Sequence, residues 1–175
     1  EGYTFITWVD LPATMPANNL EFVAEWSINP HTVTWVVDNE KTTDTYNFGD
    51  TIVKPADPEK EGYTFTGWDA EIPATVPDKD LAFTATWKVN NYTVTWNVDG
   101  VIKTENYDYG TKIEKPTTPV KEGYTFKDWT ISVPETMPAK NLDFVATWTI
   151  NTYSIKWNIG DTVETTEFDY GESVV

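Results

Sequence analysis

The side chains of this chain best placed to contact a ligand are three tryptophans, each followed by a Pro-rich loop. Trp8, Trp68 and Trp129 end the motif Gly-Tyr-Thr-Phe-x-x-Trp, and a loop of the form Pro-x-Thr-x-Pro comes shortly afterwards. A ring beside a loop is more accessible than one within a strand, and its flat apolar face can stack on a sugar. We therefore predict that these three tryptophans are partly exposed and are candidate ligand contacts.

Other residue types in the sequence offer little chemistry. Cys is absent, which excludes a thiol nucleophile, a disulfide and a Cys-based zinc site. The single histidine, His31, has Tyr92 and Tyr153 at the equivalent positions of later repeats, so we expect it to fill an aromatic slot at a junction between units. One histidine cannot supply a His-based triad to every unit. The acidic run Asp78-Lys79-Asp80 lacks the EF-hand pattern and becomes Ala139-Lys140-Asn141 in the next copy.

These observations predict a protein without enzymatic chemistry. We expect no catalytic residue, no cofactor, no metal site that recurs in each unit, and no hydrolase, transferase or oxidoreductase activity. Whether one isolated calcium ion binds is left open.

Charge excludes several partner classes. The 175-residue chain has a net charge of −16, from 28 acidic and 12 basic side chains. Nucleic acids and anionic lipid surfaces attract basic proteins, so neither is an expected partner. The sequence also has no apolar run of about 18 residues, which argues against membrane insertion. The excess of acid favours a soluble, self-repelling surface, with a cation-bridged protein as the alternative.

The tryptophans also show that the sequence repeats. All nine fall into three series with a step of 60 or 61 residues: Trp8, Trp68, Trp129; Trp26, Trp87, Trp148; and Trp35, Trp96, Trp157. A fixed period of this size is typical of a tandem array of small units. Only Asn90-Asn91 separates two predicted strands of neighbouring units, so we expect a stiff, elongated rod.

Within one unit the pattern is that of short strands joined by turns. Residues 92–98 alternate between two faces as in a half-buried strand, and Asp99-Gly100 predicts a tight hairpin turn after it. A Pro-rich link, 115–121, leads to a strand ending at Trp129, and a second alternating strand over 142–150 closes the unit. We predict a mainly β fold (α+β at most), with four short strands and at most a short helix in each unit. Six tryptophans lie on the apolar faces of the alternating strands and are predicted to be buried: Trp26, Trp35, Trp87, Trp96, Trp148 and Trp157.

The order of these motifs resembles the Listeria–Bacteroides repeat, also called the InlB B-repeat-like domain. Residues 92–148 carry the β-hairpin, Tyr109-Gly110, a Pro-containing link, Gly123 to Phe126, and a closing Ala-x-Trp, with Asp128 in place of the glycine before the tryptophan. The resemblance implies small β-grasp-like units in tandem on bacterial surface or secreted proteins, often adhesin-like, and no catalytic residues. Many members have a longer, helix-containing segment where this chain has Pro-x-Thr-x-Pro.

Two unit frames fit the repeat. In the family's frame, residues 31–91 and 92–152 are complete repeats, 1–30 is the closing part of one repeat and 153–175 the opening part of another. The alternative frame has units at 1–53, 61–114 and 122–175, joined by the Pro-rich links. In the first frame the two end parts lack strand partners and expose Trp26 and Trp157, which invites pairing with another chain.

The leading functional hypothesis is a structural stalk or spacer segment of an adhesin-like protein, extracellular and either secreted or on the bacterial cell surface. The alternative is a binding module whose partner is a host protein, a glycan or another copy of the chain in a head-to-tail filament. Exposure of Trp8, Trp68 and Trp129 would favour the binding module, because a spacer has no reason to expose a row of aromatic rings.

Overall fold

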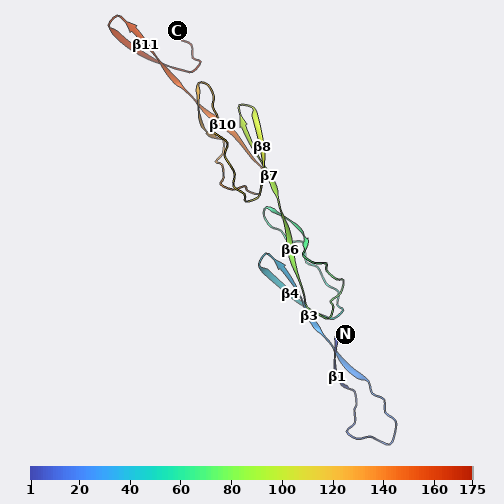
Figure 1. The fold of residues 1–175 in the computed structure, drawn as a ribbon. Helices are drawn as coiled ribbons and strands as arrows, with labels where there is room; N and C mark the ends of the chain where they lie inside the picture. The colour runs from blue at the N-terminus through green and yellow to red at the C-terminus, as the bar shows by residue number, and fades with distance from the viewer. Residues whose placement is uncertain (175) are drawn as a thin grey trace. The chain divides into compact units, whose positions relative to one another are not determined.

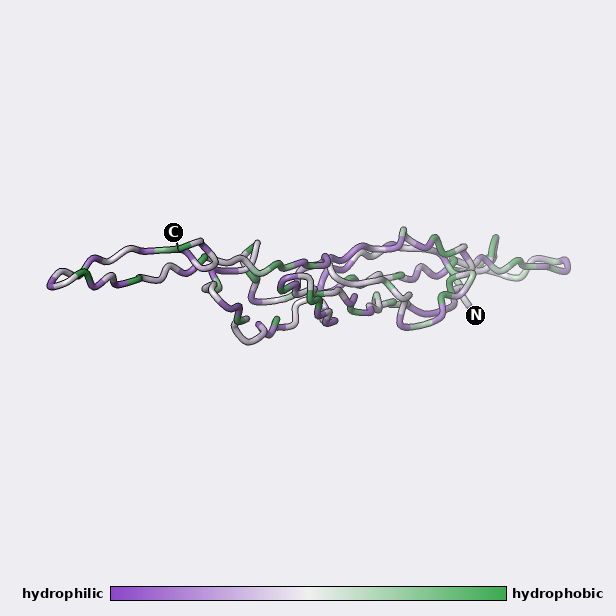
Figure 2. Tube along the Cα trace, turned by 90° about the horizontal axis from the view of Figure 1, so that it is seen from above, coloured by the Kyte–Doolittle hydropathy of each residue, from purple (hydrophilic) through white to green (hydrophobic). Residues whose placement is uncertain are grey.

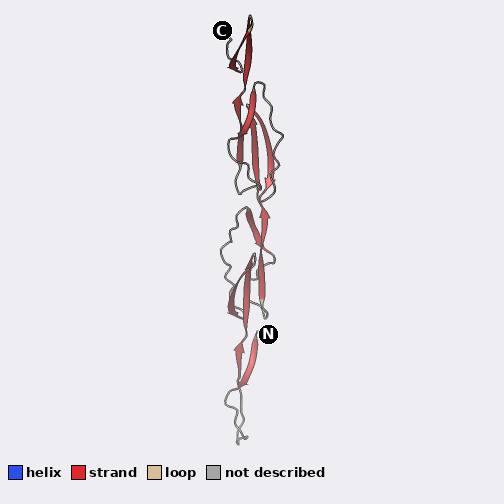
Figure 3. Ribbon diagram, turned by 90° about the vertical axis from the view of Figure 1, so that its left-hand side faces the viewer, coloured by secondary structure: helices blue, strands red, loops and turns tan. Residues whose placement is uncertain are grey.

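The chain folds through β-strands, turns and loops in the computed structural model, which describes residues 1–174 (Figures 1 and 3). No helix occurs in that range. Apolar and polar residues alternate along much of the chain, as strands with one buried face require (Figure 2). The chain divides into two compact units, residues 1–88 and 89–175, and the prediction of a mainly β tandem repeat is confirmed.

The first unit contains a two-stranded and a four-stranded sheet. The small sheet pairs β1 (Tyr3–Trp8) antiparallel with β2 (Ala24–Ile28). The larger sheet has the order β4-β3-β6-β5. Its strands are β3 (Pro30–Val37), β4 (Glu40–Asn47), β5 (Tyr63–Trp68) and β6 (Leu81–Val89). β3 and β4 form an antiparallel hairpin, whereas β3 and β6 are parallel neighbours at the centre of the sheet.

The second unit repeats this arrangement in the reverse order along the chain. Its four-stranded sheet has the order β8-β7-β10-β9, from β7 (Asn91–Val98), β8 (Val101–Asp108), β9 (Tyr124–Trp129) and β10 (Leu142–Ile150). β7 and β10 are again central and parallel. A two-stranded antiparallel sheet follows, from β11 (Thr152–Ile159) and β12 (Thr162–Asp169).

The hairpin between β7 and β8 turns where the sequence predicts. Asp99 and Gly100 both have positive φ, 50° and 89°. Two central residues with positive φ match the right-handed twist of the flanking strands and give a tight two-residue turn. Asp38 takes the same backbone conformation at the equivalent turn, with φ 54°.

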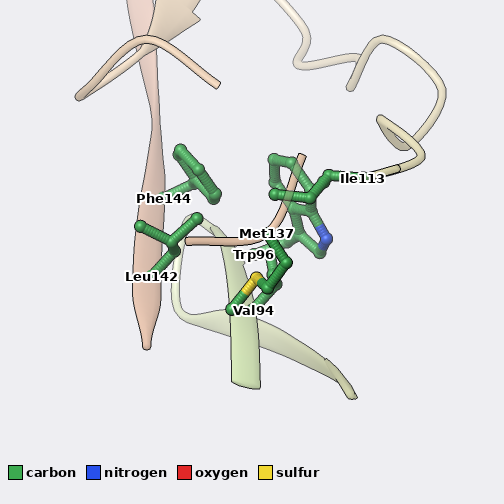
Figure 4. Close-up of a cluster of buried hydrophobic side chains, with 6 residues drawn as sticks. All are labelled: Val94, Trp96, Ile113, Met137, Leu142 and Phe144. Carbon is green, nitrogen blue, oxygen red and sulfur yellow. The ribbon is translucent and has the colours of Figure 1, made fainter. Parts of the chain in front are cut away.

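Each four-stranded sheet has its own core on one face. In the second unit, Val94 and Trp96 from β7 meet Leu142 and Phe144 from β10, and Ile113 and Met137 from the connecting loops close over them (Figure 4). The first unit places the equivalent residues in the same way: Val33, Trp35, Ile52, Val76 and Phe83. Aromatic contacts tighten both cores, because Trp35 stacks on Phe83 and Trp96 stacks on Phe144, with centroids 5.0 and 4.6 Å apart.

The prediction that all six strand tryptophans are buried is only partly correct. Trp35 and Trp96 are buried, and Trp87 and Trp148 are half-buried. The prediction is wrong for Trp26 and Trp157, which are 55% and 40% exposed. Both belong to two-stranded sheets, which lack the neighbouring strands and the loop that cover the same positions in the four-stranded sheets.

The close fit between the small and large sheets depends on glycine. Gly2 has φ 74°, and a Cβ built there would lie 2.0 Å from the ring of Phe48. Gly123 repeats this geometry against Tyr170, with φ 75° and 2.1 Å. A residue with a side chain at either position would be strained and would collide with the ring.

The domain boundaries themselves, at 1–30, 31–91, 92–152 and 153–175, stay a prediction. So does the alternative frame of 1–53, 61–114 and 122–175. The last segment of each frame ends on residue 175, outside the described residues.

Candidate functional site

The three tryptophans predicted to contact ligands occupy different environments. Trp8 is exposed at the end of β1. Trp68 and Trp129 are half-buried and pack against the core tryptophans of their own sheets, Trp68 on Trp35 and Trp129 on Trp96, at 4.8 and 4.9 Å between centroids. Packing of this kind explains their recurrence as part of the fold. Their role as ligand contacts stays a prediction.

Trp68 does, however, line an open groove in the first unit. The groove lies between the core face of the β3–β4 hairpin and the Pro-rich link, and its volume is about 600 Å³. We call it the β4 groove. Its lining includes Trp35 and Trp68, and the other lining side chains are Val37, Glu40, Thr42, Asp44, Thr45, Tyr46, Val53, Lys54, Pro55, Ala56 and Pro58.

The β4 groove combines apolar walls with unpaired polar side chains. Among residues 1–174, the indole N–H of Trp35, the hydroxyl of Tyr46 and the carboxylate of Asp44 have no side-chain hydrogen-bond partner. The indole nitrogen of Trp35 is accessible from the groove, whereas the indole nitrogen of Trp68 is buried without a hydrogen-bond partner. No feature of the sequence identifies this cluster, because the spacing of three residues on two strands does not show which of their polar groups are unpaired.

The equivalent cluster in the second unit is internally paired. Trp96 Nε1 donates to Glu105 Oε2 at 3.0 Å, and the Tyr107 hydroxyl donates to the same oxygen at 3.2 Å. Lys103 forms an ion pair with the other carboxylate oxygen at 2.8 Å. Register explains the correspondence, since Glu105 lies opposite Val94 on β7, and Asp44 lies opposite Val33 on β3.

This pairing shifts the ionisation of the second cluster. Hydrogen bonds from Lys103, Trp96 and Tyr107 hold the pKa of Glu105 below its usual value. The same contact with Glu105 raises the pKa of Lys103. Burial and the neighbouring carboxylate raise the pKa of Tyr107. The cluster is therefore a charged and structurally satisfied network at neutral pH.

A second polar cluster surrounds the single histidine. His31 is half-buried, and its Nε2 lies 2.9 Å from Asp78 Oδ1. Asp78 also accepts hydrogen bonds from the backbone N–H of Gly2 at 2.8 Å and from the side chain of Asn29 at 3.3 Å. Led by the Gly2 hydrogen bond, these contacts lower the pKa of Asp78. Gly2 directly precedes β1 and Asn29 directly follows β2, whereas His31 lies on β3, so the cluster links the small sheet to the large one.

Sequence reasoning placed His31 at a junction but missed its acidic partner. The acidic run at 78–80 is not kept in the next copy, where Ala139 replaces Asp78, so the repeat does not indicate a role for it. Only the fold brings the loop before β6 beside the start of β3, where Asp80 also accepts a hydrogen bond from the Thr32 backbone.

A lysine caps the aromatic residues in both units. Lys60 forms an ion pair with Asp38, and its ammonium lies 4.7 Å from the Tyr63 ring centroid and 5.5 Å from that of Trp87. Lys121 makes the same set of contacts in the second unit, with Asp99, Tyr124 and Trp148. Because both units contain it, this arrangement belongs to the repeat fold.

Residues 1–174 contain neither a candidate metal-binding cluster nor a candidate membrane-spanning helix. No group of three or more acidic or histidine side chains in that range is arranged to hold a metal ion. Those residues also include no helix of the length and apolarity that a bilayer crossing needs.

The family of the chain follows from the match to a known repeat. The model of the Listeria–Bacteroides repeat domain matches residues 31–87 and 92–150, the stretches that form the two four-stranded sheets. The chain belongs to this family. Each Listeria–Bacteroides repeat here contains a hairpin, a Pro-rich link, an edge strand and a closing central strand.

Relatives of this repeat segment are larger proteins. Internalin H of Listeria monocytogenes is 34% identical over 108 residues, which are 57% of this chain and 20% of internalin H. A putative membrane protein of Evansella cellulosilytica is 26% identical over 175 residues, 86% of this chain and 26% of that protein. The chain thus spans about a fifth to a quarter of these relatives. Among solved structures, a streptococcal pair of tandem repeat domains from a cell surface protein is similar at 18% identity and a TM-score of 0.27, over 70% of this chain and 98% of that one.

Proposed function

We propose that this chain is a structural spacer segment of a bacterial surface or secreted protein. The observation that carries the proposal is that both repeats use equivalent residues for one purpose, the core. Val33 and Val94, Trp35 and Trp96, and Phe83 and Phe144 are all buried pairs. The recurring residues therefore build the fold, and none is left over as a recurring catalytic constellation.

Family membership supports a location outside the cell. Internalin H is 34% identical to this chain over 108 residues, and two other relatives are named as putative membrane proteins. A net charge of −16 suits a spacer at the cell surface, because like charge disfavours non-specific aggregation. The proposal includes no enzymatic activity, and an adhesin-like function belongs to other parts of such a protein.

Small-angle X-ray scattering on the 175-residue chain tests the spacer role. A globular chain of this length has a radius of gyration of about 16 Å. A spacer has to span distance, so we expect a radius of gyration well above that figure and a scattering curve of the form that a rod gives. A radius near the globular value, unchanged by salt, would contradict the proposal.

A second candidate function, self-association, is favoured by the exposed faces of the two small sheets. Met15 is 73% exposed, whereas Val76 and Met137 at the equivalent positions are each 1% exposed. Trp157 is 40% exposed, against 4% and 2% for Trp35 and Trp96. In the family's frame, the β1–β2 sheet is the closing part of a repeat and the β11–β12 sheet is the opening part of another. We propose that separate copies of the 175-residue chain pair head to tail through these two faces, each supplying the part of a repeat that the other lacks.

Sedimentation velocity over a range of concentrations tests this pairing. The chain should form dimers and longer species, and Trp157→Asp should return it to monomer by placing a charge on the face that must be buried. Val120→Asp is the matched control, since Val120 is 93% exposed in the link before β9. A chain that stays monomeric throughout, or equal association of both variants, would reject the pairing.

A further inference from the structure

We propose that the β4 groove is a binding site for a neutral saccharide. In the first unit, one hydroxyl of the saccharide would occupy the position equivalent to that of the Glu105 carboxylate in the second unit. The inference is independent of the spacer role, because a spacer repeat can hold a ligand without changing its length.

The two units show what the groove lacks. In the second unit, Glu105 Oε2 accepts from both Trp96 Nε1 and the Tyr107 hydroxyl. In the first unit the equivalent donors are Trp35 and Tyr46, but Asp44 is one methylene shorter than Glu105 and pairs with neither. The two donors equivalent to Trp96 and Tyr107, whose hydrogen bonds Glu105 accepts, thus line an open groove in the first unit.

The position beside the Trp35 N–H and the Asp44 carboxylate suits a group that both accepts and donates hydrogen bonds. It must accept from the Trp35 N–H and meet the acceptor-only carboxylate of Asp44 nearby. A hydroxyl does both, and adjacent hydroxyls on one ring can also reach Thr42 and Glu40, which line the same groove. A saccharide is the ligand class that presents several hydroxyls on one compact ring.

Charge and packing define the ligand further. Glu40 and Asp44 line the groove, and its one cation, Lys54, already pairs with Asp57 at 2.8 Å, so an anionic ligand would be repelled. The apolar walls of Val37, Val53 and the link prolines suit the C–H faces of a sugar ring.

The recognition differs from stacking on an open aromatic face. One side of the Trp35 ring stacks on Phe83, and Trp68 packs against the ring as well. Trp35 therefore offers its N–H edge. The groove also lies on the face of β4, where side chains are presented, whereas an added peptide strand would use the backbone edge.

Two-dimensional 1H–15N NMR on the labelled 175-residue chain tests the proposal. The probes are neutral hexoses and N-acetylhexosamines, added as mono- and disaccharides. At least one should shift the Trp35 indole signal and leave that of Trp96 in place, with an affinity of roughly millimolar to tens of micromolar. If no probe moves the Trp35 signal at the highest concentration that can be reached, or if the Trp96 signal responds equally, the proposed site does not exist.

Two reciprocal variants make the test specific. Asp44→Glu supplies the internal acceptor seen in the second unit, so it should weaken binding by at least about tenfold while the fold is retained. Glu105→Asp should remove the internal acceptor of the Trp96 N–H and add a Trp96 response to the same sugar. Asp161→Glu, an exposed change in the β11–β12 turn, should bind like the parent chain. Binding that survives Asp44→Glu unchanged would overturn the assignment.

Discussion

At the scale of single residues, the equivalent side chains Asp44 and Glu105 differ by one methylene group, and this changes their hydrogen bonding. Glu105 reaches the indole N–H of Trp96, whereas Asp44 leaves the N–H of Trp35 to the solvent. Repeats can therefore share a core and still differ in what their surfaces offer. The same holds for Asp78, which accepts three hydrogen bonds at the first junction and has Ala139 as its copy.

The Glu105 network predicts acid sensitivity of the second repeat. The pKa of Glu105 is lowered in the folded state, so its stabilising contribution is full above its unfolded value of 4.5 and is lost as the pH falls through the folded pKa. We expect Glu105→Gln to lower stability at pH 7 and to flatten its decline between pH 5 and 3. Thermal unfolding followed through Trp fluorescence across that range measures both effects. Asp161→Asn is the control, and an identical pH profile for the two variants would show that the network is not coupled to folding.

At the scale of elements, each repeat is an opening hairpin completed by a closing strand. The parallel pairing of β7 with β10 places Trp96 opposite Phe144, and this single register buries the face of both strands. β11 and β12 keep the hairpin register without the parallel partner, and Trp157 is left partly exposed. Burial of the same residue type thus depends on the neighbouring strand.

A pair of tryptophan substitutions measures that dependence. Trp96→Ala should destabilise the second repeat by about 3–5 kcal/mol, the usual cost of removing a large buried aromatic side chain. At a concentration where the chain is monomeric, Trp157→Ala should cost about 1 kcal/mol or less, because the ring is 40% exposed to water. Urea unfolding with residue-resolved hydrogen exchange separates the two sites. Equal costs would mean that the β11–β12 face is covered in solution.

At the scale of the whole molecule, the strand order bears on mechanical load. The first and last strands of each four-stranded sheet are parallel neighbours, β3 with β6 and β7 with β10. Tension on the two ends of a repeat pulls these strands past each other, so their hydrogen bonds are loaded together rather than one at a time. This arrangement fits a spacer under strain.

Pulling on both ends of the chain tests this reading. Single-molecule force spectroscopy should show two unfolding events of similar force, each releasing up to about 200 Å of chain from the stretches 30–89 and 91–150. Trp96→Ala should remove one event and leave the other. A single event, or gradual extension without peaks, would show that the two sheets are not independent mechanical elements.

The sequence by itself determined the repeat, the β class and the family. Trp26, Trp87 and Trp148 recur at a fixed step, and strands that alternate apolar and polar residues produce a pattern of period two. Local backbone needs are also visible in sequence, as at Asp99-Gly100, because a tight hairpin turn requires residues that tolerate positive φ. Such features depend on neighbours along the chain, and one sequence is enough to read them.

Only the tertiary structure decided which copies of a repeated residue are buried and which polar groups are satisfied. Trp157 has the same local pattern as Trp96, yet burial depends on a strand from far along the chain. Asp78 meets Gly2, and Trp35 lacks the acceptor that Trp96 has in Glu105, because the fold fixes distances across strands and loops. Hydrogen bonds are lost over a single methylene of length, and sequence spacing does not resolve that difference.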